Sequence, residues 1–371
     1  MSVALDRILD GKEICVCAGA GGVGKTTTSA AIAMGMAAQG KRCVVLTIDP
    51  AKRLANSLGL SELGNEATQV GAERFAAAGL EMKGELWAMM LDAKRTFDDL
   101  VESYAPDARS RDRILENRIY RELSNAVAGS QEYMAMEKLY ELHAEGTYDL
   151  LVLDTPPTRN ALDFLDAPER LSKFLDSRSL QFFLKPGRTG LKMFGRGTGL
   201  LFSALKRVTG VDLLQDLSEF FTAFGDLAEG FNERAVRVSK LLSDPRSTFV
   251  LVTSPQRDAI DEAVFFNRRL RERNMPFGGV VVNRMHTEVG SGSSDGALEK
   301  DLAGVLDDAL AQRVARNFED YRALAERDQE NVTRLAEELE GEPLIIVPYL
   351  DDDVHDVAGL AVMNEHLFAS A

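Results

Sequence analysis

The sequence is poor in the side chains that bind transition metals or form disulfides. Among its 371 residues there are three cysteines, four histidines and one tryptophan. Cys15, Cys17 and Cys43 lie beside or within apolar runs, which predicts small buried thiols in a reducing compartment. Cys15 and Cys17 would share a strand face, but no third or fourth ligand is nearby, and the histidines are scattered. The sequence therefore predicts no metal site built on cysteine or histidine.

Basic residues are also in deficit, and long apolar runs are absent. Lys and Arg number 43 against 58 for Asp and Glu, which gives a formal net charge of −15. The chain lacks the basic footprint of a nucleic-acid-binding protein, so we expect no nucleic-acid partner. No run approaches the ~18 apolar residues of a membrane span, and the N-terminus lacks the apolar stretch of a signal peptide. These absences predict a cytoplasmic protein, and peripheral association with a membrane stays open as an alternative.

One glycine-rich stretch fits the pattern G-x-x-x-x-G-K-[ST] of a phosphate-binding loop. In that loop, backbone N–H groups surround phosphate oxygens, the lysine neutralises charge, and the hydroxyl reaches Mg²⁺. Residues 13–17 before it read as a strand, and residues 26–39 after it as a helix whose N-terminus faces the phosphates. The alternative is a glycine turn that binds nothing, but all the parts occur in the required order. The candidate residues are Gly19, Ala20, Gly21, Gly22, Val23, Gly24, Lys25, Thr26 and Thr27.

Two further predicted strands end in aspartate. Residues 42–48 lead to Asp49, and residues 150–153 lead to Asp154. Open α/β sheets bind ligands at the carboxyl ends of their strands, so both carboxylates, with Thr26, are candidate Mg²⁺ ligands. An alternative role for Asp49 is a helix N-cap. Asp154 ends its strand as in a Walker-B motif, and the Thr/Pro-rich turn after it suits a segment that senses the γ-phosphate.

The remaining predicted strands alternate with helical sequence. This alternation predicts an α/β fold with a mostly parallel sheet flanked by helices. Two long segments interrupt it, about 92–145 and 160–242, and predict an inserted helical subdomain within a single domain spanning 1–371. The other predicted strands are residues 86–91, 248–253, 280–283 and 344–347.

The segment 177–211 is basic although the whole chain is acidic. It contains seven Lys and Arg residues, no Asp or Glu, and many apolar and glycine residues. This composition is typical of a surface for a hydrophobic helix or an anionic membrane. The alternative is an ordinary lid whose apolar residues fold inward. Residues 213–231 then carry apolar side chains at helical spacing, which favours a core helix over a client groove.

Five segments together resemble the ArsA and guided-entry (Get) ATPases, which are deviant-Walker P-loop proteins related to MinD and ParA. The resemblance extends from the N-terminus to about Ala361. The sequence DTPPTRNALDFLDAP, which begins at Asp154, is similar to the corresponding segment of the anion-transporting ATPase homologues of actinobacteria. The segments are GxGGVGKTTT from Gly19, TIDPAKRL from Thr47, DTPPTRNALDFL from Asp154, VVNR from Val281 and VPYLDDDV from Val347.

The resemblance implies a nucleotide, a metal ion and a dimer. The nucleotide is ATP, the ion is Mg²⁺, and dimers close over the bound ATP. Asp49 would belong to the first switch and Asp154 to the second. Asn283 would hydrogen-bond adenine, and Pro348 would lie in the loop that covers the base.

Three positions depart from the family pattern. Ala20 replaces the family's intersubunit lysine, and Asn56 stands where the targeting ATPases have a water-positioning aspartate. An amide can orient water but cannot accept a proton, so we expect hydrolysis to be slow. Residues 288–296 lack the zinc-binding CxxC of eukaryotic members. A zinc-tied dimer and an arsenite site built on thiols are therefore not expected.

Three functions remain from these observations. The first, which we favour, is an ATP-hydrolysing dimeric switch for a hydrophobic or membrane-associated client, with Lys25, Asp49, Asn56 and Asp154 in catalysis. The second is the ATPase subunit of an arsenite-type anion efflux pump. The third is a hydrolysis-deficient nucleotide sensor that pairs with a paralogue carrying the intersubunit lysine. In a homodimer, Lys52 or Arg53 would have to replace that lysine.

Overall fold

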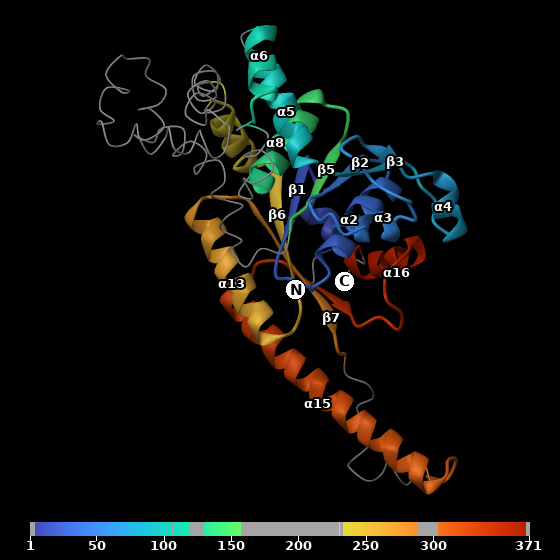
Figure 1. Cartoon of the computed structure of the whole chain (residues 1–371). Coiled ribbons are helices and arrows are strands. Elements are labelled where there is room, and N and C mark those ends of the chain that lie inside the picture. The colour runs from blue at the N-terminus through green and yellow to red at the C-terminus, as the bar shows by residue number, and fades with distance from the viewer. Residues whose placement is uncertain are drawn as a thin grey trace, which may run out of the picture. The chain divides into compact units, whose positions relative to one another are not determined.

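The computed structural model describes residues 4–105, 107–118, 120, 130–156, 230, 233–287 and 303–368. Figure 1 shows the whole chain, which divides into two units. The sheet unit comprises Met1–Met90, Gly146–Ala161 and Ser243–Ala371, and the helical unit comprises Leu91–Glu145 and Leu162–Leu242. Most of the predicted insert 160–242, with the basic segment 177–211 and the apolar repeat 213–231, lies outside the described residues, as does the loop 288–296. The predicted domain boundaries therefore stay a prediction.

An eight-stranded sheet forms the centre of the sheet unit, in the order β3-β4-β2-β5-β1-β6-β7-β8. All neighbours are parallel except β3 and β4. The predicted α/β fold with a mostly parallel sheet is confirmed. The strands are β1 (Ile14–Ala18), β2 (Arg42–Thr47), β3 (Thr68–Gln69), β4 (Glu85–Met90), β5 (Leu150–Asp154), β6 (Ser247–Thr253), β7 (Phe277–Met285) and β8 (Leu344–Pro348).

The central strands are buried on both faces because helices cover both (Figure 1). α2 and α16 pack together on one face, and α13 packs on β6 and β7 with α15 beside it. The three cysteines are buried, free thiols in this sheet, as predicted, and burial raises the pKa of Cys43 to about 12. The helices of this unit are α1 (Leu5–Ile8), α2 (Lys25–Ala38), α3 (Arg53–Ser57), α4 (Ala72–Ala77), α13 (Arg257–Glu272), α15 (Asp308–Glu338) and α16 (Val357–Leu367).

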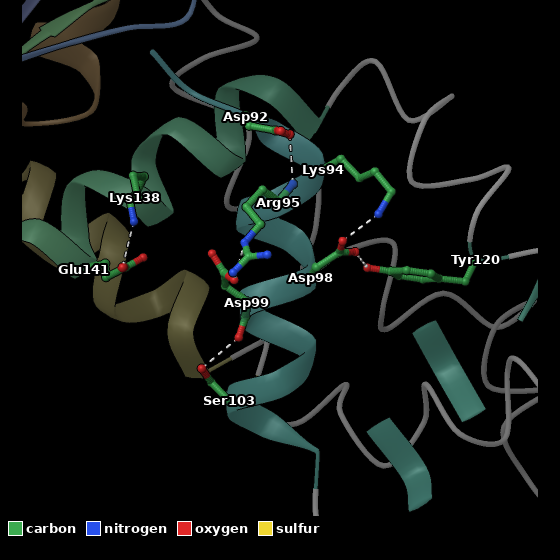
Figure 2. Close-up of polar contacts among 9 residues, drawn as sticks. All are labelled: Asp92, Lys94, Arg95, Asp98, Asp99, Ser103, Tyr120, Lys138 and Glu141. Atoms are coloured by element: carbon green, nitrogen blue, oxygen red, sulfur yellow. Dashed lines mark hydrogen bonds and ion pairs between the residues drawn. The ribbon is translucent and has the colours of Figure 1, made fainter. Parts of the chain in front are cut away.

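The helical unit contains α5 (Ala93–Tyr104), α6 (Ala108–Leu115) and α8 (Ser130–Glu145). Local charges support α5 (Figure 2). Asp92 caps the helix by accepting a hydrogen bond from the backbone N–H of Arg95 at 2.9 Å. Asp98 accepts a hydrogen bond from the Tyr120 hydroxyl at 2.6 Å, which joins Tyr120 to α5.

A buried ion pair joins α8 to the helical residues 233–242. Arg234 Nε donates to one carboxylate oxygen of Glu137, and the Tyr133 hydroxyl donates to the other at 3.0 Å. The guanidinium of Arg234 also lies 4.1 Å from the centre of the Tyr140 ring. Glu137 is 1% exposed, and burial raises its pKa although Arg234 acts in the opposite direction. The buried, ionised carboxylate of Glu137 is thus stabilised mainly by the guanidinium of Arg234.

Candidate functional site

The glycine-rich loop lies between β1 and α2, at the carboxyl edge of the sheet. Gly19 has φ 152° and Gly24 has φ 94°, a region of backbone conformation that side chains disfavour. A Cβ at Gly19 would overlap the carbonyl oxygen of Val252, and a Cβ at Gly24 would overlap the side-chain amide of Asn283. Both positions therefore require glycine, for backbone conformation and for space. The loop ends at Gly24, so the first turn of α2 is open to an anion.

Lys25 begins α2 and folds back across the loop. Its Nζ donates to the carbonyl oxygen of Ala20 at 2.6 Å, and the residue is 6% exposed. Burial lowers the pKa of the ammonium, whereas the carboxylates of Asp154, Glu262 and Asp49 raise it. This cation in a largely dry site is suited to hold a phosphate.

Asp154 ends β5 beside the loop and is 1% exposed. Its Oδ2 accepts a hydrogen bond from the Thr47 hydroxyl at 2.8 Å, whereas Oδ1 is buried without a hydrogen-bond partner in the described part of the chain. Burial raises the pKa of this carboxyl from 3.8 to about 6, although Thr26, Thr47 and Lys25 act in the opposite direction. An unpartnered carboxylate oxygen is an available ligand for a hard cation such as Mg²⁺.

Asp49 meets Asp154 through Thr47. The backbone N–H of Asp49 donates to the Thr47 hydroxyl oxygen at 3.2 Å, so one hydroxyl bridges the two strand ends. The Asp49 carboxylate accepts from the N–H of Ala51 at 2.9 Å. The alternative interpretation of Asp49 as a helix N-cap is wrong, because α3 begins at Arg53 and Lys52 occupies its N-cap position. Its carboxylate remains a candidate metal ligand.

Three other predicted site residues lie on α3, β7 and β8. Asn56 is on α3 and exposed, and Pro348 ends β8, paired with Met285 of β7. Asn283 is buried, and its Nδ2 donates to the carbonyl oxygen of Val23 at 2.9 Å. The structure thus shows Asn283 supporting the loop, a role that the sequence did not suggest. The contacts of Asn283 and Pro348 with adenine stay predictions.

Arg284 is a further site residue that sequence reasoning missed. It has a left-handed backbone with φ 62°, which is uncommon for a residue with a side chain. Its guanidinium donates to the carbonyl oxygen of Gly22 at 3.2 Å. Together with Asn283, it holds the outer side of the loop from the end of β7.

A cavity of about 590 Å³ opens beside the loop, within the size range of small-molecule sites. His286, to which the sequence assigned no role, lies in its wall. Its Nδ1 is 2.6 Å from Asp328 Oδ2, and its ring stacks on Tyr349. The cavity is lined by Ala20, Gly21, Gly22, Val23, Ser254, Pro255, Gln256, Asp258, Ala259, Glu262, Arg284, His286, Arg327, Asp328 and Tyr349.

The sequence matches the pattern of the family described as Anion-transporting ATPase over residues 12–368. The protein named ATPase get3 of Aspergillus terreus is 31% identical over 291 residues, which cover 77% of each chain. The protein named ATPase GET3 of Malassezia globosa is 26% identical over 286 residues, 76% of each chain. A putative arsenical pump-driving ATPase of Halobacterium salinarum is 31% identical over 175 residues, which cover 46% of this chain and 26% of that protein.

Proposed function

Because the chain belongs to the family of anion-transporting ATPases, we propose that it binds ATP with Mg²⁺ at residues 19–26 and hydrolyses it. The observation that carries this proposal is the buried, unpartnered Oδ1 of Asp154 beside a loop built on glycine and a buried lysine. A cation that prefers oxygen ligands would satisfy that atom.

The chemistry follows from the residues of the loop and the two strand ends. Thr26, Asp49 and Asp154 would hold Mg²⁺, which when bound neutralises charge on the phosphate oxygens. The backbone N–H groups of the loop bind the phosphates, and Lys25 exchanges the carbonyl of Ala20 for a phosphate oxygen. Asp49 and Asp154 both hydrogen-bond to the Thr47 hydroxyl, so a movement of one strand end would also displace the other.

Turnover is expected to be slow because two positions lack the usual chemistry. Asn56 can orient a water molecule but cannot take its proton. Ala20 supplies no cation, and its side chain packs near Val23, Val252 and Ala259. These residues also support a second candidate function, a nucleotide-sensing subunit that is completed by a paralogue with a lysine at this position. Measuring turnover beside ATP affinity separates the two, because a sensor binds ATP tightly without hydrolysing it.

We further infer that the ATPase is a dimeric cytoplasmic switch for a hydrophobic or membrane-associated client. No helix in the described part of the chain combines the length and apolarity of a bilayer span. The three cysteines are buried in the sheet, so they give no support to an arsenite site built on thiols. Identical proteolysis patterns with ADP and with ATP would contradict a switch. Deleting residues 177–211 tests client binding, which should be lost while ATP binding persists.

Replacing Lys25 with alanine tests the nucleotide site. We expect Lys25→Ala to abolish measurable ATP binding, because the buried phosphates lose their principal charge partner. Lys94→Ala is the matched control, since this lysine on α5 has a 44% exposed side chain and pairs with Asp98. Calorimetric titration with Mg²⁺ and ATP gives the affinity. Unchanged affinity in Lys25→Ala would show that the loop is not the site.

A further inference from the structure

The backbone N–H groups of the glycine-rich loop are free to bind an anion. In the part of the chain that the structure describes, the N–H groups of residues 21–24 donate to no acceptor. Consecutive N–H groups in such a loop form a concave donor surface, provided that they point to the same side. Gly22 has φ 80° and Gly24 has φ 94°, and glycine adopts many backbone conformations, so the loop sequence alone does not fix that direction. Contacts from outside the loop must orient its peptide groups.

Two carbonyl oxygens of the loop accept hydrogen bonds from the end of β7. Asn283 Nδ2 donates to the carbonyl oxygen of Val23 at 2.9 Å, and the guanidinium of Arg284 donates to that of Gly22 at 3.2 Å. In a planar trans peptide, the C=O and N–H groups point in opposite directions. Holding these carbonyl groups on the β7 side therefore turns the next N–H groups, those of Val23 and Gly24, away from β7. They face the side of β1 on which β5 lies.

A third carbonyl group of the loop is held from within the loop itself. Lys25 Nζ donates to the carbonyl oxygen of Ala20 at 2.6 Å. This hydrogen bond is lost when Lys25 binds a phosphate, whereas the anion does not compete for the donors of Asn283 and Arg284. The two hydrogen bonds from β7 therefore orient the loop both without and with a bound anion.

The side chain of Asn283 is held in one orientation. It is 9% exposed, and its Oδ1 accepts a hydrogen bond from the backbone N–H of Arg284 at 3.0 Å. A Cβ at Gly24 would lie 2.3 Å from Asn283 Nδ2, so the amide lies directly against the loop. Because the amide oxygen bonds an N–H group and the amide nitrogen bonds a C=O group, a rotation by 180° would lose both hydrogen bonds.

The end of β7 is itself fixed by two neighbouring elements. The backbone N–H of Tyr349, which follows β8, donates to the carbonyl oxygen of Met285 at 2.8 Å. The backbone N–H of His286 donates to Oδ2 of the buried Asp328 on α15 at 3.3 Å, and its ring Nδ1 lies 2.6 Å from the same oxygen. The loop is therefore oriented before an anion arrives, and such preorganisation raises affinity.

We propose that Asn283 and Arg284 are positioning residues that orient the N–H groups of the loop and thereby set its affinity for a phosphate chain, whatever base is attached. The inference rests on the proposed function, because it concerns how the same loop binds ATP. It differs from the adenine contact that the resemblance implies for Asn283. A residue that contacts the base affects only ligands that carry the base, whereas a residue that orients the loop affects every phosphate ligand.

Inorganic triphosphate distinguishes the two roles, because it has the phosphates of ATP without the base. Displacement of a fluorescent ATP analogue in the presence of Mg²⁺ measures the affinity for triphosphate and for ATP. Asn283→Ala should weaken both by the same factor, about 10-fold, as expected for the loss of one buried hydrogen bond. If ATP binds more weakly but triphosphate does not, Asn283 acts on the base and the inference is wrong. Asn267→Ala is the matched control, since this buried asparagine of α13 makes no described hydrogen bond to the loop and both affinities should be unchanged.

Arg284→Gly tests the second donor with two measurements that a purely structural role would change together. Glycine adopts the left-handed backbone of this position without strain, so the midpoint of urea unfolding should not fall. The affinity for triphosphate should fall about 3-fold. The factor should be the same at low and at high salt, because salt would screen an effect of the guanidinium charge alone.

Asn274→Gly is the control for the change of backbone. Asn274 also has a left-handed backbone, with φ 53°, but it follows α13 and lies outside the cavity beside the loop. Its replacement should leave the affinity for triphosphate unchanged. A loss of affinity in Arg284→Gly that disappears at high salt, or that is matched by an equal loss of stability, would contradict a positioning role for Arg284.

Binding to the unmodified chain separates this inference from the proposed function. If the unmodified chain binds ATP and both variants bind triphosphate as tightly as it does, the inference falls and the proposed ATP site stands. The same holds if the unmodified chain binds ATP but no triphosphate, because the loop then does not hold phosphates without the base. If it binds neither ligand, the proposed function falls, and the inference with it.

Discussion

The buried carboxylate of Asp154 should make the stability of the metal-free protein depend on pH. Its pKa is about 6 in the folded protein, against 3.8 without burial. This rise of about 2 in the pKa of Asp154 corresponds to a change of about 3 kcal/mol in the free energy of unfolding. Because Asp154 is 1% exposed, solvent screens little of this cost. The folded protein holds its proton to higher pH than the unfolded chain. The penalty is therefore absent below pH ~4, grows as the pH rises, and is complete above pH ~6.

Asp154→Asn removes the charge and nearly keeps the shape. The oxygen of the new side-chain amide can still accept a hydrogen bond from the Thr47 hydroxyl. Any free-energy cost of burying the amide NH₂ group is the same at every pH. The free energy of unfolding of the variant minus that of the unmodified protein should therefore rise by about 3 kcal/mol between pH 4 and pH 7.5. The other titrating groups are common to both proteins and cancel in the difference.

Urea unfolding in EDTA without nucleotide measures this difference. The single tryptophan, Trp87, lies in β4 and reports on the sheet unit by fluorescence. Adding Mg²⁺ and ATP at pH 7.5 should stabilise the unmodified protein more than the variant, because the cation compensates the carboxylate. A difference in stability that stays constant from pH 4 to pH 7.5 would refute the reasoning, since the carboxyl would then titrate alike in both states.

Two further changes have predictable outcomes. Gly24→Ala forces a side chain into φ 94° against the Asn283 amide, so it should lower ATP affinity at least about 10-fold by calorimetry; unchanged affinity would show that the loop tolerates the strain. Arg234→Ala leaves the buried Glu137 without its cation and should cost about 3–5 kcal/mol in urea unfolding, whereas the exposed Arg237→Ala should cost under about 1 kcal/mol. Equal losses in the two arginine variants would mean that the buried pair is no more important than a surface one.

The parts of the fold that could be predicted are those whose signals are local. The loop sequence and the apolar strands that end in Asp49 and Asp154 are contiguous, and the observed strand ends differ mostly by one residue from the predicted ones. Strand β7 is longer than predicted because it begins with Phe277 and two glycines, which lack a strand pattern. Strand β3 was missed, since its two residues are exposed and carry no apolar alternation.

The parts that could not be predicted join residues far apart in the sequence. Asn283 supports the loop through a contact that spans 260 positions, and no spacing rule reports such a pair. The left-handed backbone of Arg284 gives no sequence signal, because only glycine or asparagine would suggest it. The sequence could suggest Asp154 as a metal ligand. It could not show that one carboxylate oxygen lacks a hydrogen-bond partner, because that depends on how three strands pack together.

The ion pair between Glu137 and Arg234 has a consequence for how this protein can change in length. The two residues are 97 positions apart, and the helices that carry them end four residues before β5 and before β6. The pair therefore joins α8 to the helical residues 233–242 directly, whatever the number of residues between β5 and Glu233. Doubling the length of a flexible insert costs only about 0.6 kcal/mol in closure entropy, far less than the loss of the pair. Residues that follow β5 and precede Glu233 could be added, removed or exchanged among relatives while this contact within the helical unit is kept.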